Sequence, residues 1–317
     1  SKTFPGVKAL DQINLRVKRG SVHALMGENG AGKSTLMKIL YGIYIPDEGG
    51  ELILDDKPFK PGRPIDAIRR GLTMVPQEIS PAANLTIADN FYLGREITKG
   101  KFFLNQKAMN EQASAILKEL GVPMDVTEKM SDVSVAKAQL VAIATAVSND
   151  AKVIIMDEPT TALTENEVDQ LYRIIETVKA RGIAIIFISH KLDEVFRVSD
   201  EITVIRDGQY VDTKPTKEVT KEQLISMMVG RDMSEMFQRE RFELSDEIVL
   251  EIKHFTREGK YQDINFAVRK GEIFGIAGLV GAGRSEIVEG LFGYKPADSG
   301  EIYIKGEKVI INNPLDA

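Results

Sequence analysis

Residues 27–34 carry the spacing of side chains that binds phosphate groups. The segment Gly27-x-x-x-x-Gly32-Lys33-Ser34 matches a phosphate-loop pattern in full. Glycines let backbone N–H groups approach an anion closely, and the start of the following helix adds positive partial charge. Lys33 would bring a full charge to the β- and γ-phosphates of a nucleotide, and the Ser34 hydroxyl can ligate Mg²⁺. The loop therefore predicts binding of a nucleoside triphosphate with magnesium.

Two carboxylates follow a second apolar segment. Asp157 and Glu158 come directly after Val153–Met156. Ligands of open parallel sheets bind beyond the carboxyl ends of the strands, so these acids are expected at a ligand-binding edge. Asp157 suits a water-mediated contact to Mg²⁺, and Glu158 suits orientation or deprotonation of an attacking water. A solvated acidic turn is the alternative interpretation.

Two further polar residues follow short apolar segments. His190 comes at the end of the apolar segment 184–189 and could donate a hydrogen bond to a γ-phosphate. A lone histidine is more often structural, as we expect for His23 and His254. Gln77 could bind metal or water and sense the γ-phosphate, although a glutamine after a proline is common in loops.

Strands and helices alternate around these residues. Short apolar runs rich in β-branched residues predict buried parallel strands, and longer periodic segments predict helices. Gly121 is a typical stop for one of the helices. The alternation predicts an α/β domain with a mainly parallel sheet. The expected strands are Val22–Met26, Val153–Met156 and Ala184–Ile188, and the expected helices follow the glycine loop and cover residues 105–120 and 167–179. The segment 140–147 could be a buried helix or a strand, and its alanines favour a helix.

An internal repeat with an offset of 251 residues organises the chain. Residues 12–20 recur at 263–271, and the loop at 27–34 recurs as Gly278-Leu279-Val280-Gly281-Ala282-Gly283-Arg284-Ser285. A period of this length indicates a duplicated domain rather than a solenoid. The second copy has Arg284 in place of Lys33, and the two side chains are not interchangeable.

The repeat predicts the domain boundaries. The first domain is expected over residues 1–240, with a charged linker at 233–247. Residues 248–317 are then the N-terminal part of a second, degenerate copy. This segment is unlike a complete domain, because so short a chain does not bury a full core by itself.

Taken in chain order, the motifs resemble those of the nucleotide-binding subunit of an ATP-binding-cassette (ABC) transporter. The matching segments are the Walker A loop at Gly27–Ser34, the Q-loop glutamine Gln77, the Walker B strand with its glutamate at Val153–Glu158, the D-loop at Thr161–Thr164 and the switch histidine His190. The resemblance implies a P-loop NTPase cassette with a mainly parallel sheet, an antiparallel β portion and a helical subdomain at about 78–145. The start of a second cassette would follow.

The resemblance also implies a set of site residues, with ATP and Mg²⁺ as cofactors. The implied catalytic residues are Glu158, His190 and Lys33, and the implied metal ligands are Ser34, Gln77 and Asp157. Phe4 resembles the aromatic residue that stacks on adenine. The full set of nucleotide-binding residues is Phe4, Gly27, Glu28, Asn29, Gly30, Ala31, Gly32, Lys33, Ser34, Thr35, Gln77 and Ser134.

Three segments resemble bacterial monosaccharide importers of the ribose/galactose/xylose kind, namely Phe4–Leu10, residues 228–231 and residues 278–285. Related nucleoside importers share this layout. The implied partners are transmembrane permease subunits, an extracytoplasmic sugar-binding protein that acts indirectly, and a second cassette from the same chain or another copy. The implied place is peripheral, on the cytoplasmic face of the cell membrane, and residues from about 78 to 125 would contact the permease.

The signature segment departs from the family pattern Leu-Ser-Gly-Gly-Gln or Leu-Ser-Val-Gly-Gln. It reads Val133-Ser134-Val135-Ala136-Lys137, so Ala136 replaces a glycine and Lys137 replaces a glutamine. Ser134 is retained, but a helix N-cap would explain it equally well. Because cassettes of this family pair head to tail, we expect the altered signature and the altered loop with Arg284 to form one weak composite site.

Composition limits the competing interpretations. The 317 residues include 41 Lys and Arg against 47 Asp and Glu, a net charge of −6, and no cysteine. Cys-ligated metals and thiol catalysis are excluded, and the acidic balance gives no support to nucleic-acid binding. No apolar stretch approaches the length of a spanning helix. A soluble ABC ATPase with a nucleic-acid or ribosome partner, a regulatory nucleotide-binding module without turnover and a phosphate-loop kinase are the remaining alternatives.

Overall fold

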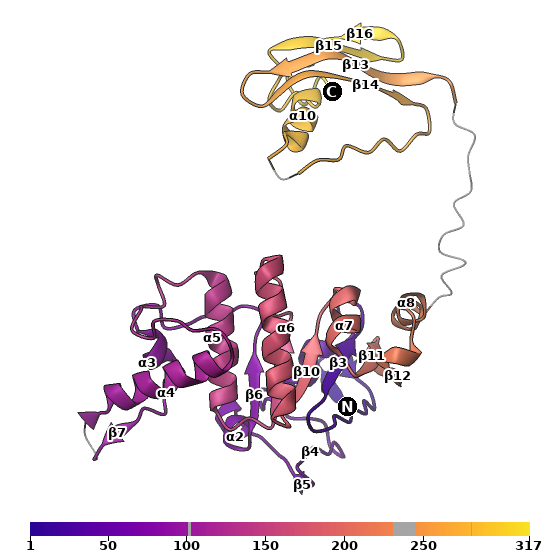
Figure 1. The fold of residues 1–317 in the computed structure, drawn as a ribbon. Helices are drawn as coiled ribbons and strands as arrows, with labels where there is room; N and C mark the ends of the chain where they lie inside the picture. Colours follow the sequence, from indigo (N-terminus) through magenta and orange to yellow (C-terminus); the bar gives the residue numbers. More distant parts are fainter. Residues whose placement is uncertain (101–102, 231–244, 280) are drawn as a thin grey trace. The chain divides into compact units, whose positions relative to one another are not determined.

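The structure is a computed structural model that describes residues 1–100, 103–230, 245–279 and 281–317. It contains two compact units, residues 1–237 and 238–317 (Figure 1). The predicted linker at 233–247 lies outside the described residues except for its last three positions. Arg231 of the segment 228–231 and Val280 of the second loop also lie outside them.

A six-stranded sheet forms the centre of the first unit. Its order is β12-β11-β3-β10-β9-β6. All neighbouring pairs are parallel except β11 and β12, which pair antiparallel at one edge. The predicted mainly parallel sheet is therefore confirmed. The strands are β3 (Val22–Met26), β6 (Leu72–Val75), β9 (Val153–Asp157), β10 (Ala184–Ile188), β11 (Glu201–Arg206) and β12 (Gln209–Pro215).

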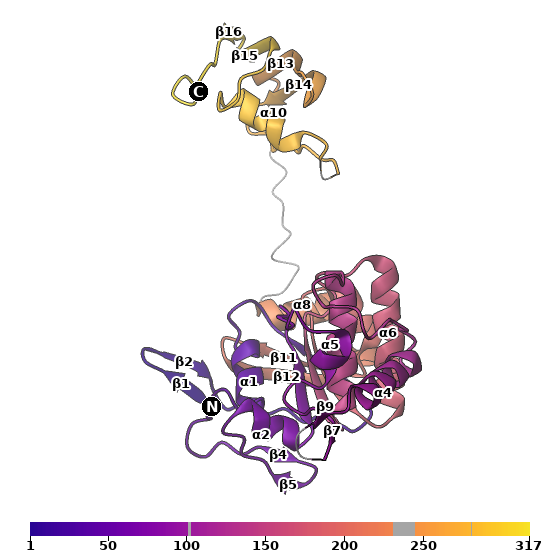
Figure 2. The same ribbon diagram turned by 90° about the vertical axis from the view of Figure 1, so that its left-hand side faces the viewer.

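Helices cover both faces of this sheet, so its central strands are apolar on both sides. Every residue of β3 and β10 is buried. Figure 2 shows α1 and α2 on one side of the strands and α5 and α6 on the other. The covering helices are α1 (Lys33–Leu40), α2 (Pro64–Arg69), α5 (Val135–Ser148), α6 (Glu165–Ala180), α7 (Leu192–Val198) and α8 (Lys221–Val229).

Three helices lie in the range 78–145 that the resemblance assigns to a helical subdomain. They are α3 (Ile87–Phe91), α4 (Gln106–Glu119) and the greater part of α5. Thr86 and Asp89 form a reciprocal capping box at the start of α3. In α4 the buried residues Met109, Ala113 and Leu117 recur every fourth position, which places one apolar stripe against its neighbours.

Short antiparallel pairs complete the first unit. A hairpin of β1 (Lys2–Phe4) and β2 (Val7–Leu10) lies beside the glycine loop, and β4 (Ile53–Leu54) pairs with β5 (Lys57–Pro58). A third pair joins β7 (Thr98–Lys99) to β8 (Phe103–Leu104), and a single 3₁₀ turn, η1 (Thr216–Glu218), precedes α8. These pairs are the predicted antiparallel portion.

The described residues of the second unit form a four-stranded antiparallel sheet with one helix. The strand order is β14-β13-β15-β16. A small core of Ile252, Phe255, Tyr261, Ile287 and Ile302 joins the sheet to α10. The elements are β13 (Ile248–Arg257), β14 (Tyr261–Arg269), α10 (Arg284–Leu291), β15 (Ser299–Ile304) and β16 (Glu307–Val309).

One strand of the repeat is present in the first unit and absent from the described part of the second. Val22 in β3 is fully buried, whereas Ile273, its counterpart at the offset of 251, is 87% exposed and lies in no strand. In the first unit β3 pairs with β10 and β11. Residues 273–277 pair with none of the strands described.

None of the helices in the described ranges is both long enough and apolar enough to span a membrane.

Candidate functional site

The glycine loop joins the central strand β3 to α1 through a backbone that needs glycine. Gly32 has a φ of 101°, and a Cβ there would lie 2.8 Å from the carbonyl oxygen of Ala9 and 2.5 Å from a methyl group of Leu10. A Cβ on Gly27 would collide with the carbonyl oxygen of Ile205 in β11. The β1–β2 hairpin and β11 therefore hold the loop closely from two sides.

The amino end of α1 fits a phosphate chain. It has no side-chain cap and no acidic residue in its first turn, so its N–H groups remain available to an anion. The Lys33 ammonium donates hydrogen bonds to the carbonyl oxygens of Gly27 at 2.6 Å and Glu28 at 3.0 Å. Burial lowers the pKa of Lys33, and Asp157 and Glu158 oppose that shift. The ammonium thus bonds to the loop and lies within the electrostatic influence of both carboxylates.

The two carboxylates lie where β9 ends, on the edge of the sheet where the loop follows β3. Asp157 is half-buried and pairs in register with Ile188 of β10. Burial raises the pKa of Asp157, repulsion from Glu158 raises it further, and Lys33 opposes the increase. A divalent cation would relieve this repulsion, so the pair fits Mg²⁺.

The protein supplies few metal ligands at this edge. Across the described ranges of the chain, no group of three or more His, Asp, Glu or Cys side chains is arranged to hold a metal ion. Mg²⁺ in nucleotide sites commonly takes one or two carboxylates, and phosphate oxygens and waters complete its shell. Asp157, Ser34 and Gln77 would be protein ligands of that kind only when a nucleotide is present.

Glu158 directly follows β9 and is contacted by residues at the ends of β6 and β10. Its backbone has a φ of 46°, and its N–H donates to the carbonyl oxygen of Ile188 at 2.9 Å. The Gln77 amide, which follows β6, donates to Glu158 Oε2 at 3.0 Å. His190 Nδ1, which follows β10, lies 3.2 Å from Glu158 Oε1. The fold therefore brings together three side chains that lie far apart in the sequence.

Phe4 contacts two neighbouring side chains, Tyr44 and Lys2. Its ring packs edge-on against Tyr44, with centroids 5.2 Å apart. The Lys2 ammonium lies 5.3 Å from the centre of the Phe4 ring. Adenine stacking by Phe4 stays a prediction.

The altered signature segment forms the start of α5. Ser134 is the N-cap residue, and its side chain accepts a hydrogen bond from the Lys137 N–H at 3.3 Å. Ala136 is buried, whereas Val135 is 68% exposed. Helix capping is thus the role that Ser134 has in the chain as described, and its contact with a nucleotide stays a prediction.

The second glycine loop repeats the local backbone of the first. Gly283 has a φ of 82°, and a Cβ there would lie 2.8 Å from the carbonyl oxygen of Lys260. Gly283 and Lys260 are the counterparts of Gly32 and Ala9 at the offset of 251. Unlike Lys33, the Arg284 side chain has no hydrogen bond or ion pair with the described residues.

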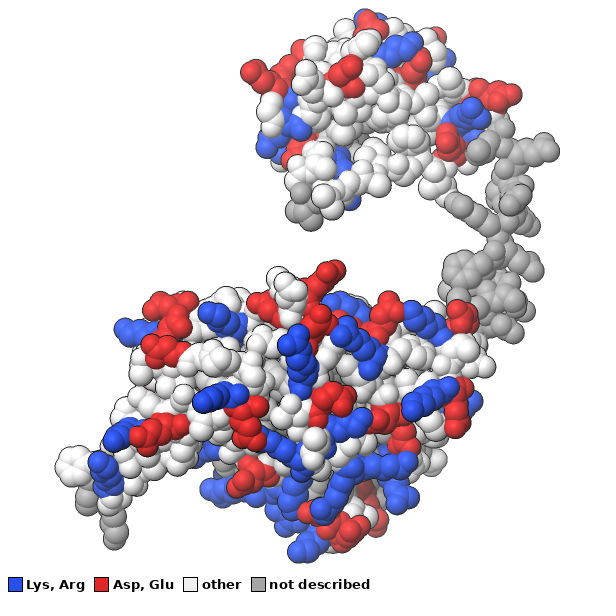
Figure 3. Space-filling view, in the orientation of Figure 1, with Lys and Arg blue, Asp and Glu red and all other residues white. Residues whose placement is uncertain are grey.

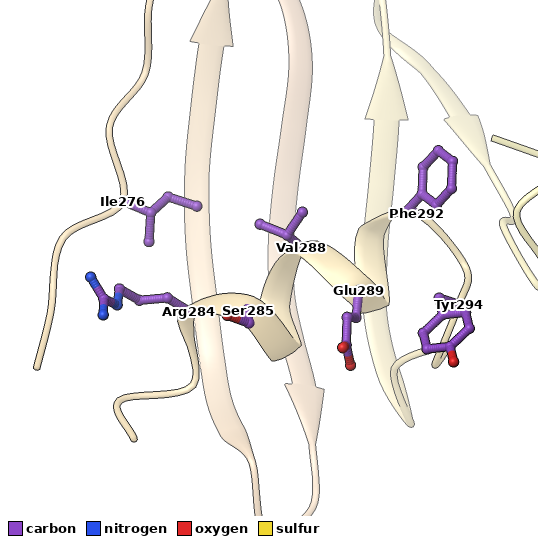
Figure 4. A pocket seen from close by; sticks show the side chains of 7 residues that line it. All are labelled: Ile276, Arg284, Ser285, Val288, Glu289, Phe292 and Tyr294. Atoms are coloured by element: carbon purple, nitrogen blue, oxygen red, sulfur yellow. The ribbon is translucent and has the colours of Figure 1, made fainter. Parts of the chain in front are cut away.

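A wide cavity opens beside this second loop. Its volume is about 660 Å³. Figure 4 shows the Arg284 side chain extending from the first turn of α10 to the side on which Ile276 lies. Apolar side chains make up much of the remaining wall, and the full lining is Ile276, Arg284, Ser285, Val288, Glu289, Phe292 and Tyr294.

The first unit has a cavity of its own. It lies away from the nucleotide site, at the amino ends of the strands. It has a volume of about 610 Å³ and is lined by cations such as Arg69, Arg70 and Lys152, with Asp55 among them. Figure 3 shows Lys and Arg gathered at the lower edge of this unit, whereas acidic and basic side chains alternate over the rest of the face shown. That face therefore has no broad basic surface of the kind that nucleic acids require.

Comparison with known proteins identifies the class. Residues 10–161 match the family model described as ABC transporter. A crystal structure of the ADP conformation of an ATP-binding cassette superposes with a TM-score of 0.61 at 26% identity, over 75% of this chain and 96% of that chain. A nucleotide-free cassette gives a TM-score of 0.61 at 27% identity, over 73% and 93%. The fold of the first unit is that of an ATP-binding cassette, and residues 10–161 belong to the ABC transporter family.

Relatives with higher sequence identity are named as import ATP-binding proteins for ribose, galactose or methyl galactoside. The chain is 47% identical to the galactose/methyl galactoside import ATP-binding protein of Fusobacterium nucleatum, over all of this chain and 63% of that protein. It is 48% identical, with the same coverage, to a Geobacillus kaustophilus protein provisionally named a ribose/galactose/methyl galactoside import ATP-binding protein. The chain thus spans about 60% of the length of these relatives.

Proposed function

We propose that this chain belongs to an ATP-hydrolysing subunit that powers the import of a monosaccharide through a membrane permease. The observation that carries the proposal is the placement of Lys33 within the glycine loop, near enough to Asp157 and Glu158 at the same edge of the sheet for their charges to act on it. The names of the relatives support sugar import.

Each residue of the site would have a separate task. Bound Mg·ATP supplies the bond to be cleaved and a Lewis acid that offsets phosphate charge. The loop amides and Lys33 would hold the β- and γ-phosphates, and Asp157, Ser34 and Gln77 would hold the metal. Glu158 would orient the attacking water. Gln77 and His190 each contact one oxygen of Glu158, and these contacts would hold the carboxylate in one orientation.

A groove in the first unit supports a permease partner. Its volume is about 250 Å³, and its walls come from the segment after Gln77 and from α5. Ile79, Pro81, Met130 and Val141 are among the lining residues. We propose that a short segment of the permease docks in this groove, which would hold the subunit at the cytoplasmic face of the membrane.

A nucleotide-binding module without turnover is the second candidate. Ala136 and Lys137 in the signature segment and Arg284 in the second loop favour it, because each departs from the pattern of hydrolysing cassettes. Importers of nucleosides share the layout and differ from the first proposal in the transported ligand alone.

Phosphate release by the intact protein with its permease tests these alternatives. The proposal expects Mg²⁺-dependent release of phosphate from ATP, stimulated by the loaded binding protein. Nucleotide binding without release would favour the module. Uptake of labelled ribose and galactose, compared with a labelled nucleoside, separates the two classes of transported ligand.

A further inference from the structure

A buried carboxylate next to the candidate site has no task in the function proposed above. Glu194 is in the first turn of α7, and only 7% of its surface is exposed. Its Oε2 accepts hydrogen bonds from the hydroxyls of Thr160 and Ser189, each at 2.8 Å. Its Oε1 lies 3.0 Å from the Lys191 ammonium. A charged group this deeply buried is normally satisfied by such partners, and here all of them come from two loops.

The two loops are those that carry Glu158 and His190. Thr160 is two residues after Glu158, and Ser189 directly precedes His190. Both hydroxyl-bearing residues are buried, with 2% and 4% of their surfaces exposed. A single carboxylate oxygen therefore joins the loop that leaves β9 to the loop that leaves β10.

Two further contacts extend this connection to the candidate catalytic groups. The Glu158 N–H donates to the Ile188 carbonyl oxygen, and the Glu158 carboxylate contacts His190. The Lys191 N–H donates to Ser189 Oγ at 3.1 Å, which fixes the hydroxyl that bonds to Glu194. Burial together with the nearby Glu194 charge raises the pKa of Tyr172 to about 12, in spite of Arg197. The carboxylate is thus part of a closely packed polar cluster.

We infer that Glu194 is a positioning residue that fixes the distance between Glu158 and His190 by bonding Thr160 and Ser189 at once. Glu194 is buried and bonds to both loops, so it would act through them. The inference rests on the proposed function, because fixing that distance matters for turnover only if Glu158 and His190 carry out hydrolysis. Misplacement of catalytic groups by small distances is known to be costly.

Substitution of Glu194 in the intact protein tests the inference. Glu194→Ala should lower kcat by about 10- to 100-fold, because it leaves two buried hydroxyls without an acceptor. The affinity for ATP should change by less than about 3-fold, since the glycine loop is untouched. Glu194→Gln keeps the side-chain volume and one acceptor oxygen, so it should lower kcat by a smaller factor than Glu194→Ala. Glu176→Gln removes the same charge from an exposed position of α6 and should leave kcat unchanged.

A double substitution separates positioning from a general structural role. If Glu194 acts through His190, Glu194→Ala should add less than about 2-fold to the loss already caused by His190→Ala. A general loss of structure would instead lower kcat by the same factor in both backgrounds, and would weaken ATP binding too. Either of those results would overturn the inference.

Amide hydrogen exchange gives a readout that does not require turnover. In Glu194→Gln the N–H groups of Glu158 and Lys191 should exchange at least about 10-fold faster, whereas those of β3 should be unaffected. Unchanged exchange at both positions would overturn the positioning role. A wild-type protein without ATPase activity would overturn the proposed function instead, and the exchange experiment would still decide whether Glu194 holds the two loops.

Discussion

The two glycine loops share local backbone contacts, but they differ in the partners of their cations and in the strands beside them. In each loop, a Cβ on the glycine before the helix would lie 2.8 Å from a carbonyl oxygen of the preceding hairpin. In each, the alanine N–H bonds to a carbonyl three residues earlier, at 3.1 Å. The repeat in the sequence is therefore also a repeat in local structure, through Gly32 and Gly283.

The surroundings separate the two loops. The Lys33 ammonium donates hydrogen bonds to two carbonyl groups and is influenced by the charges of two acids. Arg284 has no side-chain partner in the described part of the chain. Val22 is buried in a six-stranded sheet, whereas Ile273 is mostly exposed. The strands next to the first loop thus place two acids near its cation, whereas the second loop adjoins no parallel strand among the described residues.

The largest expected effect on ATP hydrolysis comes from substitution of Glu158. Glu158→Gln should lower ATP hydrolysis on the order of 10²-fold or more, because the amide cannot accept a proton from water. Binding of ATP should be retained. Steady-state phosphate release and equilibrium binding measure the two quantities. Normal turnover in this variant would mean that the first loop is not the hydrolytic one.

The next effect compares the two cations directly. Lys33→Ala should weaken ATP binding by about 10- to 100-fold, since it removes a charge-assisted contact to phosphate. Arg284→Ala should change the affinity by less than about 3-fold. Titration calorimetry on both variants measures the difference. Equal losses would show that the two loops contribute alike, against the asymmetry described above.

A third comparison concerns the glycines themselves. Gly32→Ala and Gly283→Ala each place a Cβ against a carbonyl oxygen at positive φ. Each should destabilise its own unit by about 1–3 kcal/mol. Gly32→Ala should be the more costly of the two, because its Cβ would also meet Leu10. Chemical denaturation followed separately for each unit is the measurement, and a neutral Gly32→Ala would contradict the described loop.

The smallest expected effect comes from substitution of Asp157, whose pKa is raised by burial and by repulsion from Glu158. Because the pKa of Asp157 is raised in the fold, the stability linked to it is present at low pH and is lost as pH rises through the folded value. Asp157→Asn should therefore raise the melting temperature at neutral pH without nucleotide, by about 2 °C. The difference from the wild type should shrink as the pH falls. A lower melting temperature at neutral pH would contradict the repulsion between Asp157 and Glu158.

Much of the fold could be predicted because the signals are local. The runs at 22–26 and 184–188 are strands with the expected bounds, and the segment at 105–120 is helical because its apolar residues recur at helical spacing. The segment at 140–147 was ambiguous between helix and strand, and its alanines correctly favoured a helix.

Other features could not be predicted because they depend on tertiary contacts. The Glu194 cluster was missed, since no spacing rule connects Thr160, Ser189 and a glutamate of the next helix. The exposure of Ile273 was also not foreseen, because the apolar sequence at 273–277 resembles that of the buried strand β3. The roles of Phe4 and Ser134 remain predictions, as both have partners within the nucleotide-free chain.

A crystal structure of the Glu158→Gln protein with Mg²⁺ and ATP is the most direct test of the central claim. The account predicts that the phosphates lie on the amides of residues 27–35 beside Lys33, with the metal between Ser34 and Asp157. Nucleotide bound elsewhere, or a metal remote from Asp157, would contradict it.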